Sequence, residues 1–201
     1  MDQDINLVII DTVPLFEQYE TDIIKLDAEF FIWVSANLQK LDNNIEETFQ
    51  KLAKKSLSNY LVEKEQEKLT GIPFADTHES QVRVHSTSGN FTILLMVNKQ
   101  VIGRIGLQKI DSKKALVRKT YVQPTYRGNN FGEILIEKLK SEAIARNFEK
   151  LKLGTFQFMK SAIKLYLKTG FEVCEYNNEL GVSIEDADQI GGFAMELSLE
   201  E

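Results

Sequence analysis

The first part of the chain shows one short strand pattern followed by helical periodicity. Residues 6–10 are a continuous run of mostly apolar side chains, which predicts a short buried strand. Pro14 suits the first turn of a helix, and apolar residues then recur at steps of three and four over 15–38. Capping-box spacing opens a further predicted helix over 44–61. The pattern therefore predicts a helical N-terminal part over residues 14–69.

The periodicity changes from helical to strand-like near the middle of the chain. Residues 71–90 contain Gly, Pro and many small polar side chains, which predicts a loop with at most a short strand at 82–85. Three strand-like runs follow, separated by two short polar turns. These runs lie at 91–97, 101–110 and 115–122. We therefore expect an antiparallel meander in this region.

The last third of the chain alternates helix and strand patterns. The predicted helices lie at 131–143 and 161–169, and the predicted strands at 151–156, 171–176 and 193–199. A strand, helix, strand order after a meander predicts a mixed sheet, so the expected fold class is α/β, of the α+β mixed-sheet kind. The sequence shows no internal repeat or Pro-rich linker, and we expect residues 1–201 to form a single domain.

Composition narrows the classes of function. The formal net charge of −6 and the pI of about 5.2 give no general positive field for nucleic acid or an anionic membrane surface, so we expect neither partner. Cys174 is the only cysteine, which excludes an intramolecular disulfide, and His78 and His85 lack metal-binding spacing. The first residues show no signal-peptide pattern, and no run reaches the ~20 apolar residues of a membrane span, which predicts a cytoplasmic protein.

A glycine-containing turn joins the strand at 115–122 to the next predicted helix. The turn, residues 127–132, reads RGNNFG. Unpaired backbone N–H groups at a helix N-terminus favour an anion such as phosphate, glycine lets the ligand come close, and Arg127 adds positive charge. The alternative is that Gly128 and Gly132 only shape a tight turn. The turn lacks the Gly-Lys-Ser/Thr ending of a triphosphate-binding loop, and it does not follow an early strand as the dinucleotide fingerprint does.

Two motifs in this region resemble those of the GNAT superfamily of N-acetyltransferases. The family's pyrophosphate loop reads Gln/Arg-x-x-Gly-x-Gly/Ala after a Val-x-Pro-x-Tyr-like stretch, and residues 122–132 read VQPTYRGNNFG. Asn130 stands where the central glycine is usual, and asparagine tolerates the left-handed conformation better than most residues. Residues 162–171 match the second motif, Ala-x-x-Leu-Tyr-x-Lys-x-Gly-Phe, whereas Met159 replaces an asparagine that often lies near the pantetheine arm. The resemblance is specific from residue 115 to 176.

The resemblance implies a fold, a cosubstrate and a set of contacts. The implied fold is the GNAT acyl-CoA N-acyltransferase fold, with a central, mostly antiparallel, splayed sheet flanked by helices. Residues 115–176 would form its coenzyme A-binding core, and residues 14–69 its acceptor-side wall. The implied cosubstrate is acetyl-CoA, with no metal. The implied coenzyme contacts are Tyr121, Val122, Arg127, Gly128, Asn129, Asn130, Phe131, Gly132 and Glu133.

The resemblance also implies direct attack of a neutral amine on the acetyl thioester, with an oxyanion on the carbonyl and a thiolate leaving group. The backbone N–H of Val122 is the expected oxyanion donor, and removal of such a donor typically costs about 100-fold in rate. Tyr166 is the candidate general acid, because a phenol with a pKa of about 10 stays protonated at neutral pH. The alternative is that Tyr166 is a helix residue that only packs on the sheet.

The acceptor side is less well defined by the sequence. The strand offers Arg118, Lys119 and Thr120 where a carboxylate would serve as general base, so no base is assigned and a water chain is the alternative. An acidic loop over 177–192 would attract a cationic amine, or is simply solvated. Some aromatic residues of the N-terminal helices are candidates either for the acceptor pocket or for the core. They are Tyr19, Phe30, Phe31 and Trp33.

Three functions remain open from the sequence alone. The first is an acetyl-CoA-dependent N-acetyltransferase that acts on a primary amine of a small molecule or peptide, as a monomer or homodimer. The second is a non-catalytic acyl-CoA-binding or regulatory module, which would account for Asn130, Met159 and the missing base. The third is an interaction protein that uses its N-terminal helices and binds no phosphate ligand.

Overall fold

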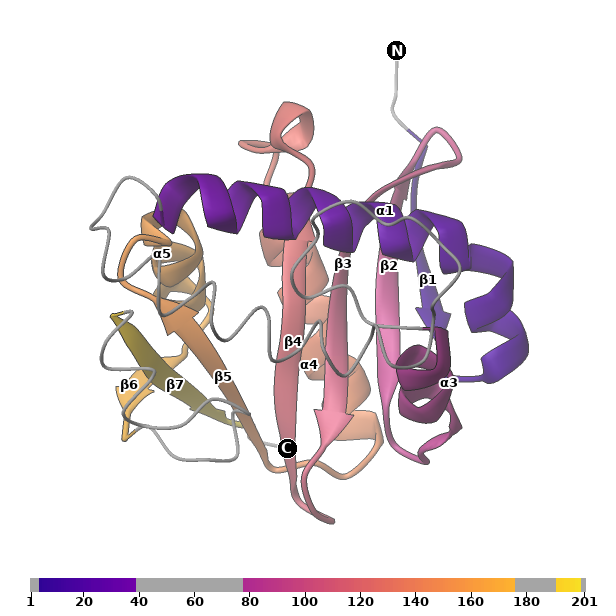
Figure 1. Cartoon of the computed structure of the whole chain (residues 1–201). Coiled ribbons are helices and arrows are strands. Elements are labelled where there is room, and N and C mark those ends of the chain that lie inside the picture. The colour runs from indigo at the N-terminus through magenta and orange to yellow at the C-terminus, as the bar shows by residue number, and fades with distance from the viewer. Residues whose placement is uncertain (1–3, 39–77, 176–190, 200–201) are drawn as a thin grey trace.

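The computed structural model describes residues 4–38, 78–175 and 191–199 of the 201-residue chain. The helix predicted over 44–61 and the acidic residues of the loop over 177–192 lie outside this part. Within it, one sheet carries helices against both of its faces (Figure 1). This arrangement confirms the predicted α/β class with a mixed sheet.

The described strands form one seven-stranded sheet with the order β1-β2-β3-β4-β5-β7-β6. They are β1 (Ile5–Ile10), β2 (Phe91–Val97), β3 (Gln100–Lys109), β4 (Lys114–Val122), β5 (Lys150–Phe156), β6 (Glu172–Cys174) and β7 (Gly192–Ser198). Neighbouring strands are antiparallel except β4 and β5, which are parallel. The predicted meander is confirmed by β2, β3 and β4, whose ends lie within one residue of the predicted runs.

Short polar turns connect the central strands. Asn98 and Lys99 have φ angles of 50° and 67°, the left-handed pair that a tight two-residue hairpin favours. In the next turn the Asp111 carboxylate accepts hydrogen bonds from the backbone N–H groups of Lys113 and Lys114, both at 2.8 Å. The Lys113 amide is the largest cause that lowers the pKa of Asp111 from its usual value. The polar residues between the strands therefore make the turns that set the meander.

Four helices surround the sheet in the described part of the chain. They are α1 (Val13–Leu38), α3 (His78–Ser86), α4 (Phe131–Ala145) and α5 (Lys160–Lys168), with a short 3₁₀ turn at Pro124–Tyr126. Figure 1 shows α1 crossing one face of the sheet and α4 on the other. The strand predicted at 82–85 must be corrected, because it lies within α3.

Residues 82–85 are helical because tertiary contacts outweigh a short local pattern. Two valines alternate there with polar residues, and a four-residue window cannot separate a strand from one helical turn. In the helix, His85 turns inward: its ring stacks on that of Phe16 with 5.0 Å between centroids, and its Nε2 lies 3.2 Å from Thr92 Oγ1. These contacts join α3 to α1 and β2.

Each face of the sheet has its own buried cluster. The cluster on the α1 face consists of Ile10, Phe16, Ile23, Leu26, Leu94, Val101 and Tyr121. The larger cluster on the α4 face includes Ile93, Leu95, Leu135, Leu139 and Tyr166. Successive side chains of a strand point to opposite faces, so β2 supplies alternate residues to the two clusters. The sheet is therefore buried on both sides, and β4 is a wall common to both.

β4 and β5 pair over only three residues before they separate. Residues 114–116 pair with 150–152, and beyond this point the two strands diverge (Figure 1). The register of β4 against β3 also shifts next to Arg104, and Lys119 of β4 has a φ of 53°. An irregularity of this kind bends a strand and redirects its side chains. Residues 117–122 therefore lie along β3 on one edge and are not paired with β5 on the other.

A buried charge cluster ties α1 to this bent part of β4. The Asp27 carboxylate of α1 accepts hydrogen bonds from Arg104 Nη1 of β3 at 2.9 Å and from Lys119 Nζ of β4 at 2.8 Å. Asp27 and Arg104 are each only 3% exposed, so solvent screens their charges little. One carboxylate thereby connects the helix, the neighbouring strand and the irregular residue of β4.

Replacement of Asp27 by Asn should lower the free energy of unfolding by about 3–5 kcal/mol, because it leaves two largely buried cations without their carboxylate. Urea unfolding measures the loss. Glu137→Gln is the control. The Glu137 side chain pairs with Lys140 but is itself 53% exposed, so its replacement should cost less than about 1 kcal/mol. A loss below about 1 kcal/mol for Asp27→Asn would mean that the cluster does not anchor α1.

Candidate active site

The end of β4 presents a backbone donor on the side from which β5 has separated. Val122 pairs with Gly103 of β3, while the Gln123 N–H donates to the Ile102 carbonyl at 2.9 Å. Hydrogen-bonded and non-hydrogen-bonded pairs alternate along an antiparallel ladder. Because the pair of Ile102 and Gln123 is hydrogen-bonded, the Val122 N–H points away from β3. It is therefore directed to the side on which a ligand can replace β5.

The first turn of α4 has backbone N–H groups that the helix itself does not use. The first helical hydrogen bond runs from the Ile134 N–H to the Asn130 carbonyl at 3.0 Å, so the amides of Phe131, Gly132 and Glu133 precede it. Asn130 has a φ of 60° and makes no side-chain capping bond to any described residue. It thus adopts the left-handed conformation in which a glycine is usual. The uncapped amides and the helix dipole favour an anion at this end of α4.

The loop before α4 is shaped by its own backbone. Asn129 Nδ2 donates to the Tyr126 carbonyl at 3.0 Å, which closes the turn after the 3₁₀ segment. Gly128 has a φ of 86°, and a Cβ placed on it would meet nothing within 4 Å. The glycine is therefore favoured by the backbone conformation rather than by crowding. The space beside it leaves the loop accessible.

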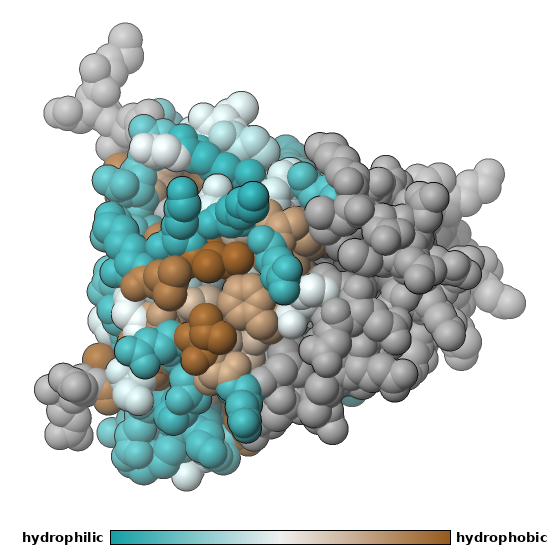
Figure 2. All heavy atoms as spheres, turned by 90° about the vertical axis from the view of Figure 1, so that its left-hand side faces the viewer, coloured by the Kyte–Doolittle hydropathy of each residue, from teal (hydrophilic) through white to brown (hydrophobic). Residues whose placement is uncertain are grey.

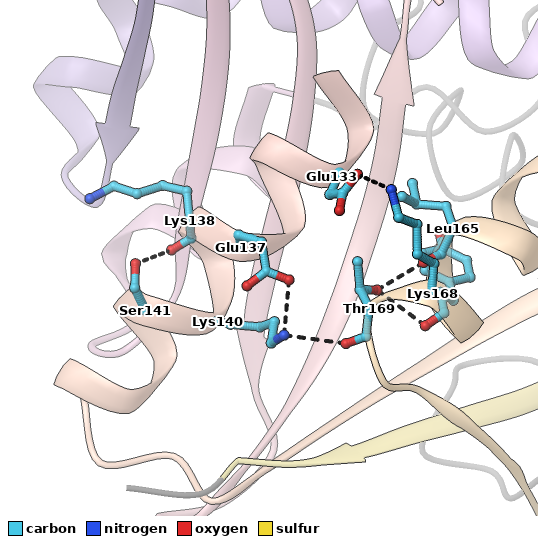
Figure 3. Close-up of polar contacts among 9 residues, drawn as sticks. Glu133, Glu137, Lys138, Lys140, Ser141, Leu165, Lys168 and Thr169 are labelled. Atoms are coloured by element: carbon cyan, nitrogen blue, oxygen red, sulfur yellow. Dashed lines mark hydrogen bonds and ion pairs between the residues drawn. The ribbon is translucent and has the colours of Figure 1, made fainter. Parts of the chain in front are cut away.

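The two helices that carry the sequence motifs lie close together (Figure 3). A Cβ at Gly132 of α4 would lie 2.7 Å from Leu165 Cδ2 of α5, so this glycine allows the close approach. Glu133 Oε2 and Lys168 Nζ form an ion pair at 2.6 Å across the same contact. The Glu133 side chain is thus engaged with α5, and its amide is the group that it offers to a ligand. The contact places α5 beside the start of α4.

Tyr166 lies on α5 with its side chain buried toward β4. The residue is 7% exposed, and its ring packs beside Phe171 with 5.7 Å between centroids. Burial is the main cause that raises the pKa of this phenol, and a hydrogen bond with the Thr120 side chain acts in the opposite direction. The phenol therefore stays protonated at neutral pH. Tyr166 belongs to the core and also reaches β4 two residues before its end, so both predicted roles remain compatible with its position.

Arg127 turns its side chain back over the end of β4. Its Nε donates to the Val122 carbonyl at 2.9 Å. Its guanidinium carbon lies 5.4 Å from the centroid of the Trp33 ring and 5.5 Å from that of the Tyr121 ring. Both distances are within the range of cation–π contacts. The first residue of the predicted phosphate loop is therefore in contact with α1 as well as with β4.

The side chain of Tyr121 lies on the α1 face, and its backbone pairs with Arg104 of β3. Its hydroxyl lies 3.5 Å from Glu29 Oε2, and Gln123 Nε2 donates to both oxygens of the same carboxylate at 3.0 and 3.1 Å. Burial, and then the negative charge of Glu29, raise the pKa of the Tyr121 phenol, whereas Arg127 lowers it. A carboxylate, an amide and a phenol thus meet where α1 passes the end of β4.

Glu29 and Asp27 are the site-forming residues that sequence reasoning missed. Asp27 comes four positions after Ile23 in the buried stripe of α1, and Glu29 comes four before Trp33. A charged residue within or beside an apolar helical stripe needs a partner, because burial of an unpaired charge is costly. That local signal was present in the sequence, but it does not tell which strand supplies the partner.

Met159 has a structural role at the start of α5. It is buried together with Val34 of α1, and Thr155 Oγ1 lies 3.7 Å from its sulfur. Trp33 and Phe158 belong to the same cluster, with 6.1 Å between their ring centroids. Figure 2 shows the face of the molecule at the left of Figure 1, where hydrophobic side chains gather amid hydrophilic ones. Apolar packing therefore joins the C-terminal part of α1 to β5 and α5.

The four aromatic residues considered for the acceptor pocket have different environments. Tyr19 and Phe30 pack against the buried cluster of the α1 face, as the core interpretation predicts. Trp33 contacts Arg127 and is partly buried, so it is not fully part of the core. The side chain of Phe31 lies outside the described structure.

Metal and membrane features can be stated for the described residues alone. Within 4–38, 78–175 and 191–199, no group of three or more His, Cys, Asp or Glu side chains is arranged to hold a metal ion. No helix among those residues is long and apolar enough to cross a membrane. Cys174 is a free thiol, and burial is the main cause that raises its pKa.

Comparison with known proteins gives a family match over the motif region. The family model described as the acetyltransferase (GNAT) family matches residues 49–171, which is more than half of the chain. A curated relative, the IAA acetyltransferase of Azospirillum brasilense, is 40% identical over 55 residues. This alignment covers 27% of the present chain and 36% of the relative, so the chain spans only about a third of the length of that protein.

Solved structures resemble the chain over almost its whole length. A GNAT-family acetyltransferase from Staphylococcus aureus Mu50 has a TM-score of 0.61 at 17% identity, with 98% of this chain and 99% of the other covered. The PaiA N-acetyltransferase of Thermoplasma acidophilum, solved in complex with coenzyme A, has a TM-score of 0.62 at 16% identity and covers 96% and 99%. At these identities the similarity concerns the fold.

Proposed function

The chain belongs to the GNAT family of acetyltransferases, and we propose that it transfers an acetyl group from acetyl-CoA to a primary amine of a small molecule or peptide by direct attack. The observation that carries the proposal is the orientation of the Val122 N–H at the end of β4, on the side that β5 has left. Val122, Tyr166 and the start of α4 all pack against one buried cluster. A backbone donor, a neutral phenol and an anion-binding helix end therefore belong to one region.

Coenzyme A carries a pyrophosphate that suits the first turn of α4. The amides of Phe131, Gly132 and Glu133 precede the first helical bond and would donate to its oxygens. Residues 127–130 form the loop before them, and the left-handed angles of Gly128 and Asn130 shape it. The Thermoplasma acidophilum protein, which has the same fold, was solved with coenzyme A, and this supports the choice of ligand.

The residues at the end of β4 and on α5 suit acetyl transfer to an amine. Bound acetyl-CoA would supply the acetyl thioester, and the neutral amine would attack its carbonyl carbon. The Val122 N–H would stabilise the negative charge that develops on the carbonyl oxygen. As the carbon–sulfur bond breaks, the nitrogen loses a proton to solvent water, and Tyr166 donates its phenolic proton to the leaving sulfur. Solvent then restores the proton of Tyr166.

A second candidate is a module that binds acyl-CoA without turnover. The buried position of Met159 favours it, because the polar residue that the family often has there is replaced by an apolar contact. Both candidates predict coenzyme binding through α4. They differ only in whether thiol is released in the presence of an amine.

Calorimetry with acetyl-CoA, followed by a thiol-release assay with a panel of primary amines, tests the proposed function. We expect coenzyme binding and release of free coenzyme A with at least one amine. Binding without release across the panel would favour the non-catalytic module. Absence of both heat and a thermal shift with acetyl-CoA would contradict the coenzyme site and favour an interaction protein.

Replacement of Tyr166 by Phe should lower kcat about 100-fold, because a positioned general acid typically contributes at least that factor. The coenzyme affinity should change less than about twofold, since only the proton donor is removed. The pKa of Tyr166 is raised, so the phenol loses its proton above the usual value of about 10. The wild-type rate should therefore fall in that alkaline range, and the pH profile of the variant should lack this decrease. Unchanged kcat in a variant with unchanged free energy of unfolding would reject the assigned role.

A further inference from the structure

Two aromatic rings lie beside the guanidinium of Arg127 where α1 passes β4, and a carboxylate contacts the hydroxyl of one of these rings. The guanidinium carbon lies 5.4 Å from the Trp33 centroid and 5.5 Å from the Tyr121 centroid. Ring faces attract a positive charge at such distances. Glu29 Oε2 lies 3.5 Å from the hydroxyl oxygen of Tyr121, one of these two aromatic residues. Arg127 therefore occupies surroundings that suit a cation.

The Glu29 carboxylate has neutral hydrogen-bonding partners within the described part of the chain. They are the Gln123 amide, at 3.0 and 3.1 Å, and the Tyr121 hydroxyl. The charges of Glu29 and Arg127 act with opposite sign on the pKa of that phenol, so both lie within electrostatic reach of the same ring. A carboxylate at this position favours an ammonium group nearby.

Arg127 is placed to leave this position when a phosphate binds. Its side chain is exposed, and it is held by the Val122 carbonyl and the two rings. The same residue begins the loop that leads to the α4 amides that precede the first helical hydrogen bond. Arginine forms strong, charge-assisted and often bidentate hydrogen bonds with phosphate. A pyrophosphate at the start of α4 would therefore compete with Trp33 and Tyr121 for the guanidinium.

We propose that Glu29, Trp33 and Tyr121 bind the cationic group of the acceptor, and that the Arg127 guanidinium holds this position until the coenzyme's pyrophosphate draws it away. The inference rests on the proposed transferase function and specifies its acceptor side. Arg127 bonds to the carbonyl of Val122, whose N–H is the proposed oxyanion donor. An ammonium that takes the place of the guanidinium thus lies beside the reacting end of β4.

The neighbours of Trp33 define the rest of the acceptor as apolar. Phe158 lies 6.1 Å from Trp33 between ring centroids, and it stacks on Phe156 at 5.5 Å. All three are partly buried in one apolar cluster. The structure therefore fits a primary amine on an apolar body that binds in its protonated form, and whose nitrogen loses a proton to solvent before it attacks.

The fluorescence of Trp33, the single tryptophan of the chain, provides the test. The probe is 2-phenylethylamine, titrated with and without saturating coenzyme A. In the wild type, coenzyme A should tighten the apparent affinity for the probe at least tenfold, because it removes the competing guanidinium. Arg127→Gln should bind the probe at least tenfold more tightly than the wild type when coenzyme A is absent.

Glu29→Gln tests, in the same experiment, whether the charge of Glu29 is needed for binding of the cationic probe. It should weaken probe binding at least tenfold in the presence of coenzyme A, and the neutral analogue 2-phenylethanol should bind this variant and the wild type equally. Glu17→Gln is the matched control, since Glu17 is an exposed residue of the same helix and its replacement makes the same charge change. It should leave probe binding unaltered.

Three results would overturn the inference: no effect of coenzyme A on the wild type, no gain in Arg127→Gln, or probe affinity unaltered in Glu29→Gln. Calorimetry with coenzyme A on the same samples separates this failure from failure of the proposed function. If coenzyme A binds but no amine releases thiol from acetyl-CoA, the transferase proposal fails while the fluorescence result still decides the cation site. If coenzyme A does not bind, the coenzyme-linked part is overturned, and Arg127→Gln alone decides whether the guanidinium blocks the site.

Discussion

The early end of pairing between β4 and β5 is the constraint on which the rest of the structure depends. Backbone N–H and C=O groups in the interior of a protein require partners. Beyond residue 116, β4 no longer has β5 to supply them on that side. The Val122 N–H is consequently directed to a place where a ligand atom, and not a neighbouring strand, can accept its hydrogen bond. A sheet paired along its full length would have closed this position.

Opposite faces of β4 then carry different parts of the chemistry. The α4 face presents the uncapped amides around Gly132 and the neutral phenol of Tyr166, which suit an anion and a leaving thiolate. The α1 face presents Glu29, which suits a cation. Asp27 holds α1 against β3 and β4 by its two buried ion pairs, so the position of Glu29 two residues later follows from that anchor. A buried structural carboxylate thus positions a more accessible one.

The sequence predicts the parts of this fold that depend on local pattern. The apolar runs predict the central strands within one residue, and the RGNNFG turn predicts the start of α4. These features are predictable because they depend on residues that are adjacent in the sequence. The strand predicted at 82–85 fails, since the stacking of His85 on Phe16 joins residues distant in sequence. The contact of Glu29 with Gln123 spans 94 positions, and no local periodicity encodes it.

The proposed coenzyme site combines features that the sequence predicts with features that depend on the fold. The left-handed angle at Asn130 follows from its place in the motif, and the close approach of Gly132 to Leu165 brings two motifs that are far apart in sequence into contact. The direction of the Arg127 side chain does not follow from the motif. It depends on the rings of Trp33 and Tyr121, which come from different elements and meet only in the folded chain.

Hydrogen exchange of individual backbone amides, with and without acetyl-CoA, tests the central claim most directly. The account predicts that acetyl-CoA slows exchange at Val122 and at Phe131, Gly132 and Glu133, whose N–H groups have no acceptor among the described residues. Ile134, which already donates within α4, should change little and serves as the internal reference. Binding of acetyl-CoA that leaves Val122 and the first turn of α4 unprotected would contradict the account.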